Sequence, residues 1–207
     1  MKNNTTATAY ESRHQPYSEK VNRAPSNAAR IEIITGKIDH APAIAYIGRT
    51  AFRKAFALLF NSCADLEEYL DYTYSVDKLA SSLRKENNVY FLATVDGLPV
   101  GFAKVKRHSL NDQLDSVFQA ELQKLYVLKE YQGSGVGQAL MNTVARFVSS
   151  FEPDCLWLDT YVGNERAIRF YERNGFQKAG THQFTIGSQT FEYFLMALPI
   201  TINQTCQ

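Results

Sequence analysis

The sequence contains few cysteines. Only three occur in 207 residues, at Cys63, Cys155 and Cys206, and they stand far apart. Their spacing matches no metal-binding or redox motif. A scattered, odd set of this kind is typical of reduced thiols, so we expect a cytoplasmic protein.

Long apolar runs and an excess of charge are also missing. No stretch approaches the roughly 18 consecutive apolar residues that a membrane helix needs, and residues 1–6 lack the apolar run of a secretory signal. The formal net charge of +1 gives no reason to expect nucleic acid or a membrane surface as a partner. We expect no metal site, because the four histidines are isolated from one another and from the cysteines: His14, His40, His108 and His182.

The length and composition favour one globular domain. Apolar residues make up 45% of the chain and charged residues 21%, which is ordinary for such a domain. Residues 1–29 are polar and lack periodicity, so we expect a flexible N-terminal tail, with docking on a second subunit as the alternative. The domain is expected over 30–200, and a short C-terminal tail over 201–207.

Hydrophobic periodicity predicts seven strands and four helices. Strands are expected at 30–35, 89–95, 99–105, 117–127, 155–162, 176–186 and 190–198. Helices are expected from Asp39, acting as N-cap, to about 58, then at 65–84, from about 136 to 151, and at 165–173. Asp96-Gly97 predicts a tight hairpin turn. The order βααβββαβαββ combines antiparallel hairpins with one βαβ crossover, which indicates a single mixed α/β domain.

A glycine cluster, Gln132-Gly-Ser-Gly-Val-Gly137, lies between a strand and a helix. Glycines let backbone N–H groups turn toward a ligand, and the helix that begins here adds unpaired N–H groups with a partial positive charge. A phosphate or pyrophosphate therefore suits this loop. A plain turn is the alternative when the cluster is taken alone.

Two common phosphate loops do not fit this cluster. A Walker loop needs Lys and then Ser or Thr after its last glycine, and Gln138-Ala139 stand there instead. A dinucleotide fingerprint belongs to repeated βαβ units, which the antiparallel hairpins contradict.

The segment 125–141 resembles the acetyl-CoA signature of GNAT acetyltransferases. The pattern of Arg or Gln, two residues, Gly, one residue, then Gly or Ala is met by Gln132, Gly135 and Gly137. A second family signature appears over 164–176, as Asn164, Ala167, Phe170-Tyr171 and Asn174-Gly175-Phe176. Many members have proline where this chain has Lys129, a position that shapes the turn.

The resemblance implies the GNAT fold, a mixed and mostly antiparallel twisted sheet of about seven strands flanked by helices. It also implies acetyl-CoA as co-substrate and an N-acetyltransferase activity. The residues implied in cofactor binding are Leu125, Tyr126, Val127, Gln132, Gly133, Ser134, Gly135, Val136, Gly137, Gln138, Asn164, Ala167 and Tyr171. A homodimer is expected, since such domains often dimerise.

The same resemblance suggests catalytic roles. Tyr171 is the candidate general acid, because a phenol can protonate a thiolate of comparable basicity. The N–H of Val127 can face the thioester oxygen. Glu121 is the candidate base, since plain alternation would place it on one face with Gln123, Leu125 and Val127; a solvated carboxylate is the alternative. Asp159 and His182 are lesser candidates.

The acceptor is predicted to be a primary amine. The helix expected at 65–84 carries Asp65, Glu67, Glu68, Asp71 and Asp77 beside three tyrosines, a set able to hold an extended cation unless it is only a solvated face. Several stretches also resemble the PaiA-type spermine/spermidine acetyltransferases, although Tyr193 departs from that pattern. We therefore expect a polyamine acceptor, with another small amine, a protein amine, or a non-catalytic acetyl-CoA sensor as alternatives.

Overall fold

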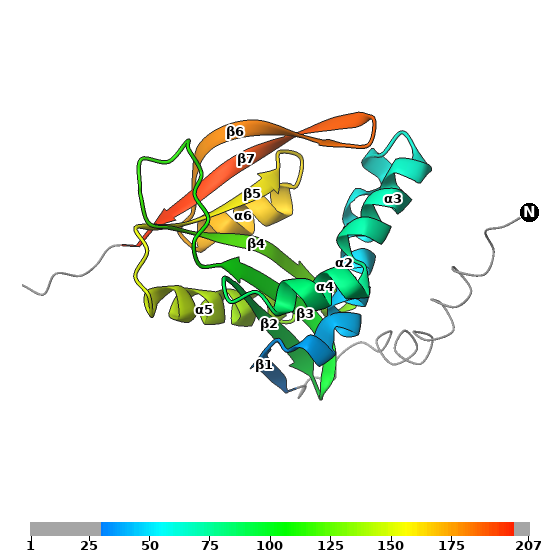
Figure 1. The fold of residues 1–207 in the computed structure, drawn as a ribbon, viewed down its shortest axis with the longest axis horizontal. Helices are drawn as coiled ribbons and strands as arrows, with labels where there is room; N and C mark the ends of the chain where they lie inside the picture. Colours follow the sequence, from blue (N-terminus) through cyan, green and yellow to red (C-terminus); the bar gives the residue numbers. More distant parts are fainter. Residues whose placement is uncertain (1–29, 201–207) are drawn as a thin grey trace, which may run out of the picture.

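The computed structural model describes residues 30–200, and the tails predicted at 1–29 and 201–207 lie outside them. All seven predicted strands are present, and they form one sheet. They are β1 (Ile31–Thr35), β2 (Asn88–Val95), β3 (Leu98–Lys106), β4 (Gln119–Val127), β5 (Cys155–Tyr161), β6 (Gln177–Ile186) and β7 (Gln189–Pro199). The helices are α2 (Ala41–Phe56), α3 (Cys63–Thr73), α4 (Val76–Leu83), α5 (Val136–Ser149) and α6 (Glu165–Arg173), with three short 3-10 turns (Figure 1).

The sheet has the strand order β1-β2-β3-β4-β5-β7-β6. Every neighbouring pair is antiparallel except β4 and β5, which are joined through α5 and run parallel. The β2–β3 turn forms at Asp96 and Gly97, both with positive φ, as the sequence predicts. The mixed α/β architecture and the single crossover are therefore confirmed.

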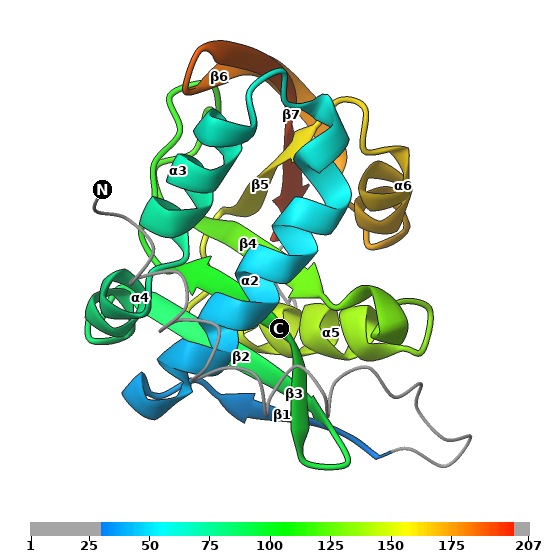
Figure 2. The same ribbon diagram turned by 90° about the vertical axis from the view of Figure 1, so that its right-hand side faces the viewer.

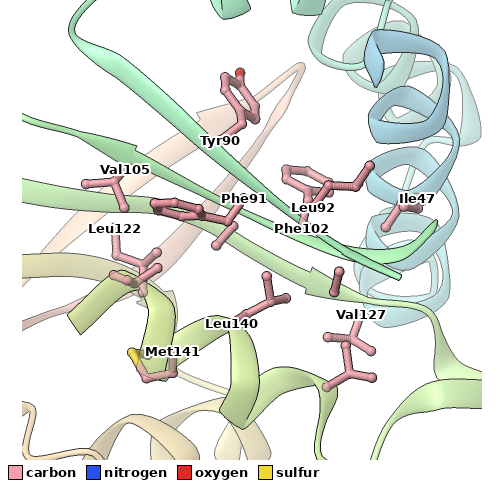
Figure 3. Packing of buried hydrophobic residues seen from close by; sticks show 14 of the residues in the cluster. Ile47, Tyr90, Phe91, Leu92, Phe102, Val105, Leu122, Val127, Leu140 and Met141 are labelled. Atoms are coloured by element: carbon pink, nitrogen blue, oxygen red, sulfur yellow. The ribbon is translucent and has the colours of Figure 1, made fainter. Parts of the chain in front are cut away.

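Helices cover both faces of the sheet, and two adjacent residues of β2 show this. The Tyr90 hydroxyl donates to Ser82 Oγ on α4 at 2.8 Å. The next side chain, Phe91, points the other way and packs on Phe147 of α5. The main core lies between the sheet and these helices, with Leu92, Phe102, Leu140 and their neighbours fully buried (Figures 2 and 3).

Two details of the helix prediction are wrong. Asp39 does not cap the first helix; it lies in a 3-10 turn, Ile38–His40, and α2 begins after it. The single helix predicted at 65–84 is two helices, because Ser75 starts a new one by accepting a hydrogen bond from the Lys78 N–H. Tyr74, at the break, is buried between them and the sheet.

Strands β4 and β5 separate along their length. Their pairing is limited to three positions, from Gln119↔Cys155 to Glu121↔Trp157. Beyond Glu121, the rest of β4 keeps β3 as its partner and faces β5 across a gap in the ladder. Backbone groups on that edge need another partner, since unpaired buried N–H and C=O groups are costly.

The tip of the β6–β7 hairpin is fixed to the start of α3. Asp65 Oδ2 accepts hydrogen bonds from the N–H and the hydroxyl of Ser188, both at 2.7 Å. Gln189 bonds the Leu59 carbonyl at 2.6 Å and the Asn61 N–H at 2.9 Å. Segments more than a hundred residues apart in sequence are joined here.

Within residues 30–200, no helix has both the length and the apolar character needed to cross a lipid bilayer.

The core position of Leu140 gives a test of this packing. Leu140→Ala should lower the free energy of unfolding by about 2–5 kcal/mol, because it leaves a cavity in a fully buried site. Leu58→Ala is the matched control: Leu58 is fully exposed, so the change should stay within about 0.5 kcal/mol. Urea unfolding followed by circular dichroism measures both, and equal effects would contradict the assigned core.

Candidate active site

A cleft of about 1360 Å³ opens where β4 and β5 separate. Its walls come from α2, α3, α4, the strands β2 to β7, the loop before α5, and α6. Of the residues that the sequence implicates in catalysis and cofactor binding, all line the cleft except Ser134 and Val136. Val136 is fully buried in the core, and Ser134 Oγ donates to the Tyr131 carbonyl at 2.7 Å. The two side chains therefore stabilise the loop without lining the cleft.

The glycine loop presents a row of backbone donors. Gly133 and Gly135 have φ of +86° and +92°, a conformation that side chains strain against. Gly135 is the N-cap of α5 and no side chain caps it. Within the described residues, no backbone N–H from 133 to 138 donates a hydrogen bond. Such a row at a helix N-terminus fits a phosphate or pyrophosphate.

Gln132 ties this loop to two other elements. Its Nε2 donates to the Val127 carbonyl at 3.0 Å, and its Oε1 accepts from Arg166 Nη1 on α6 at 2.7 Å. Arg166 lines the cleft together with Lys54 and Lys129, which add positive charge beside the loop. Sequence reasoning missed these three cations, because no motif marks them and only the fold gathers them.

The open edge of β4 offers backbone groups to the cleft. The Leu128 N–H donates to the Val100 carbonyl on β3 at 2.9 Å. Because backbone groups alternate sides along a strand, the N–H of Val127 points to the opposite edge, toward β5. Leu125, Tyr126 and Val127 all line the cleft. The predicted donor position of Val127 therefore agrees with the register.

Helix α6 brings three predicted residues to the cleft: Asn164, Ala167 and Tyr171. The Asn164 side chain caps the helix by accepting from the Ala167 N–H at 3.2 Å. Tyr171 is buried, and burial raises the pKa of its hydroxyl to about 12. The phenol thus keeps its proton across the physiological pH range, as a proton donor must.

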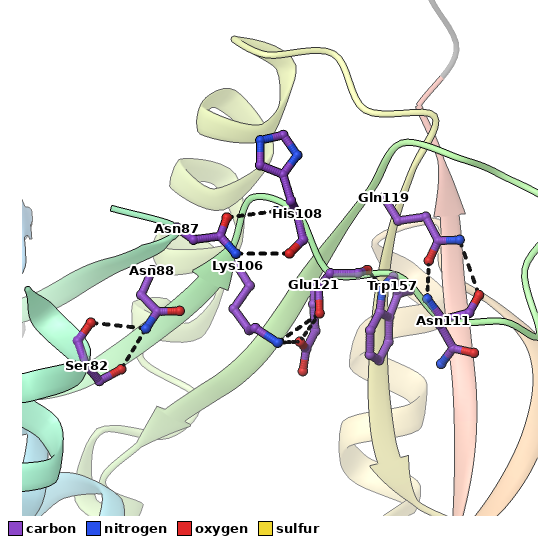
Figure 4. A network of polar contacts seen from close by, with 10 residues as sticks. Ser82, Asn87, Asn88, Lys106, His108, Asn111, Gln119, Glu121 and Trp157 are labelled. Carbon is purple, nitrogen blue, oxygen red and sulfur yellow. Dashed lines mark hydrogen bonds and ion pairs between the residues drawn. The ribbon is translucent and has the colours of Figure 1, made fainter. Parts of the chain in front are cut away.

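Glu121 lies at the point where the strands part. Its carboxylate accepts from the Ser109 hydroxyl at 2.7 Å and forms an ion pair with Lys106 at 3.1 Å. The Ser109 carbonyl in turn accepts from Trp157 Nε1 at 2.7 Å (Figure 4). The carboxylate is therefore buried with partners rather than solvated.

Plain alternation gives the wrong face for Glu121. The β3–β4 register shifts between Lys104↔Lys124 and Val105↔Leu122, which leaves Gln123 as an extra residue on β4. This bulge reverses the parity of the strand, so Glu121 shares a face with Lys124 rather than with Leu125 and Val127. The sequence carries no glycine or proline at this point to signal the bulge.

Asp159 on β5 and His182 on β6 lie next to each other in the lining of the cleft. Asp159 Oδ2 is 3.5 Å from His182 Nε2. Burial raises the pKa of the Asp159 carboxyl to about 6; His182 opposes the shift and Glu121 adds to it. Both residues line the cleft. Their pairing through strands β5 and β6 could not be derived from sequence spacing.

The acidic residues predicted to hold an acceptor cation lie elsewhere. None of the five carboxylates at 65, 67, 68, 71 and 77 lines the cleft. Asp65 binds Ser188, Glu67 pairs with Arg49 and Arg53, and Asp71 pairs with Arg49. Only the aromatic part of the prediction reaches the cleft, through Tyr69. Three of the five carboxylates thus have structural partners within residues 30–200: Asp65, Glu67 and Asp71.

Comparison with known proteins agrees with this geometry. Residues 49–176 match the model of the acetyltransferase (GNAT) family. An uncharacterized N-acetyltransferase of Mycobacterium tuberculosis is 30% identical over 131 residues, covering 63% of this chain and 80% of that protein. One from Lactobacillus delbrueckii is 26% identical over 147 residues, covering 70% and 85%.

Solved structures show the same fold. The PaiA N-acetyltransferase of Thermoplasma acidophilum, determined in complex with coenzyme A, superposes with a TM-score of 0.66 at 22% identity, covering 82% of this chain and 99% of that one. The ribosomal-protein-S18-alanine N-acetyltransferase of Escherichia coli gives 0.63 at 22% identity, covering 86% and 99%.

The chain therefore belongs to the GNAT acetyltransferase family. It is an acetyl-CoA-dependent N-acetyltransferase. The residues of the cleft fit that co-substrate, because the row of free N–H groups at 133–138 suits a pyrophosphate and the open edge of β4 suits an amide-containing arm.

Gly135→Glu tests the loop. A carboxylate placed at the N-cap of α5 would repel the pyrophosphate, so binding of coenzyme A should fall below detection by isothermal titration calorimetry. Gly97→Glu is the control: this glycine also has positive φ, at +80°, but lies in the β2–β3 turn with open space around it. Equal affinity in both variants would mean that the loop does not hold the phosphates.

Proposed function

We propose that this chain transfers the acetyl group of acetyl-CoA directly to a primary amine, with donor and acceptor bound in the cleft together. The observation that carries the proposal is the arrangement around the separated strands. One cleft contains unpaired N–H groups for phosphates, an open strand edge, a protonated phenol and a buried carboxylate.

Tyr171 acts as the general acid in this proposal. Acetyl-CoA supplies an activated thioester, and its thiolate needs a proton on leaving. The Tyr171 hydroxyl makes no hydrogen bond within residues 30–200 and lines the cleft, so its proton is available there. The N–H of Val127 stabilises negative charge on the carbonyl oxygen that forms during attack.

Glu121 is the proposed general base. The amine must lose a proton to become a nucleophile, and Glu121 lines the cleft at the parting of the strands. Lys106 and Ser109 hold its carboxylate in place, so it acts directly or through a bound water. Asp159, on the opposite wall, attracts the incoming ammonium group.

A polyamine remains the acceptor that the sequence predicts. Its support is the resemblance to the PaiA-type enzymes and the aromatic lining that includes Tyr69 and Tyr193. A homodimer also stays a prediction, which sedimentation velocity would test. Neither is needed for the transfer chemistry.

Release of coenzyme A in the presence of amines tests the function. The panel contains spermine, spermidine, putrescine, aminoglycosides and lysine peptides, with thiol appearance as the signal. Turnover with one class identifies the acceptor. Binding of acetyl-CoA without thiol release under any condition would contradict the proposal and favour a sensor module.

Tyr171→Phe isolates the proton donor. It should lower kcat about 10²–10³-fold, because one positioned acid is lost, while the affinity for acetyl-CoA stays within about twofold. Tyr72→Phe, on the exposed side of α3, should leave kcat unchanged. Steady-state kinetics with calorimetry separates the two effects, and full activity of Tyr171→Phe would remove this residue from the mechanism.

The titration of Asp159 predicts a difference in pH dependence. Because its pKa is raised to about 6, the carboxyl is neutral at pH 5 and charged above pH 6. The ratio of kcat/KM between the wild type and Asp159→Asn should therefore approach 1 near pH 5 and rise about tenfold by pH 7.5. Asp77→Asn, outside the cleft, gives a ratio near 1 throughout. A ratio independent of pH would exclude Asp159 as the ammonium-binding group.

A further inference from the structure

Two lysines stand side by side on the wall of the cleft. Lys104 of β3 and Lys124 of β4 are direct cross-strand partners, and both line the cleft. Like charges in this position repel each other, so the pair is unfavourable unless something else compensates. Lys78 of α4 lines the same region and adds a third positive charge.

Neither of the paired lysines forms an ion pair within residues 30–200; the carboxylate that acts electrostatically on both is Glu121, which is itself paired with Lys106. Lys104 is only 8% exposed, and its Nζ lies 5.5 Å from the centre of the Tyr90 ring. Lys124 Nζ lies 5.4 Å from Tyr74 and 5.9 Å from Tyr126. Burial lowers the pKa of each lysine to about 8, which leaves most molecules charged at pH 7. Aromatic rings lie near both ammonium groups, and Glu121 offsets part of the fall in their pKa.

Three carboxylates line the cleft, and none forms an ion pair with Lys104 or Lys124. Glu121 pairs with Lys106, Asp159 faces His182, and Glu130 lies just before the glycine loop. The β3–β4 wall therefore has surplus positive charge, whereas the β5 wall opposite presents a carboxylate. A buried charge without a partner is costly, so an anionic ligand that bound between the two lysines would offset that cost.

We propose that the acceptor is an amine that also carries an anionic group, a carboxylate or a phosphate, which binds between Lys104 and Lys124. This inference rests on the proposed function and specifies its substrate class. The amine end lies toward Asp159 on β5 and the anionic end toward β3 and β4. This acceptor class differs from the polyamine that the sequence predicts, because a simple polyamine carries only positive charge and the two lysines would repel it.

Matched pairs of amines test the proposal. Each pair differs only in the anionic group: lysine and cadaverine, ornithine and putrescine, phosphoethanolamine and ethanolamine. In every pair that is turned over, the anionic member should have a kcat/KM about 10- to 100-fold higher, as expected for hydrogen bonds to charged groups. Calorimetry of the same pairs on protein saturated with coenzyme A measures binding independently of turnover.

Variants assign the effect to the lysines. Lys104→Met and Lys124→Met keep an unbranched side chain one heavy atom shorter and remove the charge, so each should reduce the preference about tenfold or more. Because an unpaired buried charge is removed, neither should lower the melting temperature. Lys178→Met is the control, since Lys178 on β6 is exposed and lies outside the cleft. The affinity for coenzyme A should be the same in all three.

Several results would overturn the inference. One is equal or tighter binding of the amines without an anionic group, and another is a preference for spermidine over all anionic amines. A preference that survives both lysine substitutions would exclude the pair as its cause, and a parallel loss of coenzyme A affinity would assign the lysines to the donor. Absence of thiol release with every amine would instead contradict the proposed function, and the binding preference would still decide this inference.

Discussion

The separation of β4 from β5 is the constraint on which the site depends. Within one sheet, ladder pairing satisfies backbone groups almost everywhere, and here it stops after Glu121. The parting exposes an edge of β4 and makes room for a cleft. It also places α5 and α6 on either side of that cleft, so the glycine loop, Tyr171 and the strand edge converge. Every proposed catalytic group is positioned relative to this one break in the ladder.

Much of the fold could be predicted because its local signals agree with its tertiary structure. Alternating or continuous runs of β-forming residues marked all seven strands, Asp96-Gly97 marked a hairpin, and Asn164 marked a helix start that the structure confirms. The prediction failed where a local signal was ambiguous. Asp39 is a good N-cap residue, yet a 3-10 turn precedes the helix, and Ser75 divides a pattern that reads as continuous.

The site was predictable only in part, for a physical reason. The motif residues of the loop and of α6 are local in sequence, so spacing located them. The face of Glu121 depends on an extra residue in β4, and the Lys104–Lys124 pair depends on the register with β3, which no spacing reveals. Conversely, Glu67 and Asp71 of α3 belong to the set predicted to bind a ligand cation, but they pair with Arg49 and Arg53. Charge composition of a helix does not say which way its charges face.

The contact between the β6–β7 hairpin and α3 has a consequence for acceptor size. Ser188 and Gln189 join the hairpin tip to Asp65 and to the turn before α3 through four hydrogen bonds. The two segments cannot move apart without breaking these bonds together. An acceptor too bulky for the space between the hairpin and α3 would have to break these hydrogen bonds before it could bind. Its entry would then be limited by a conformational step rather than by diffusion. Slender amines avoid that step.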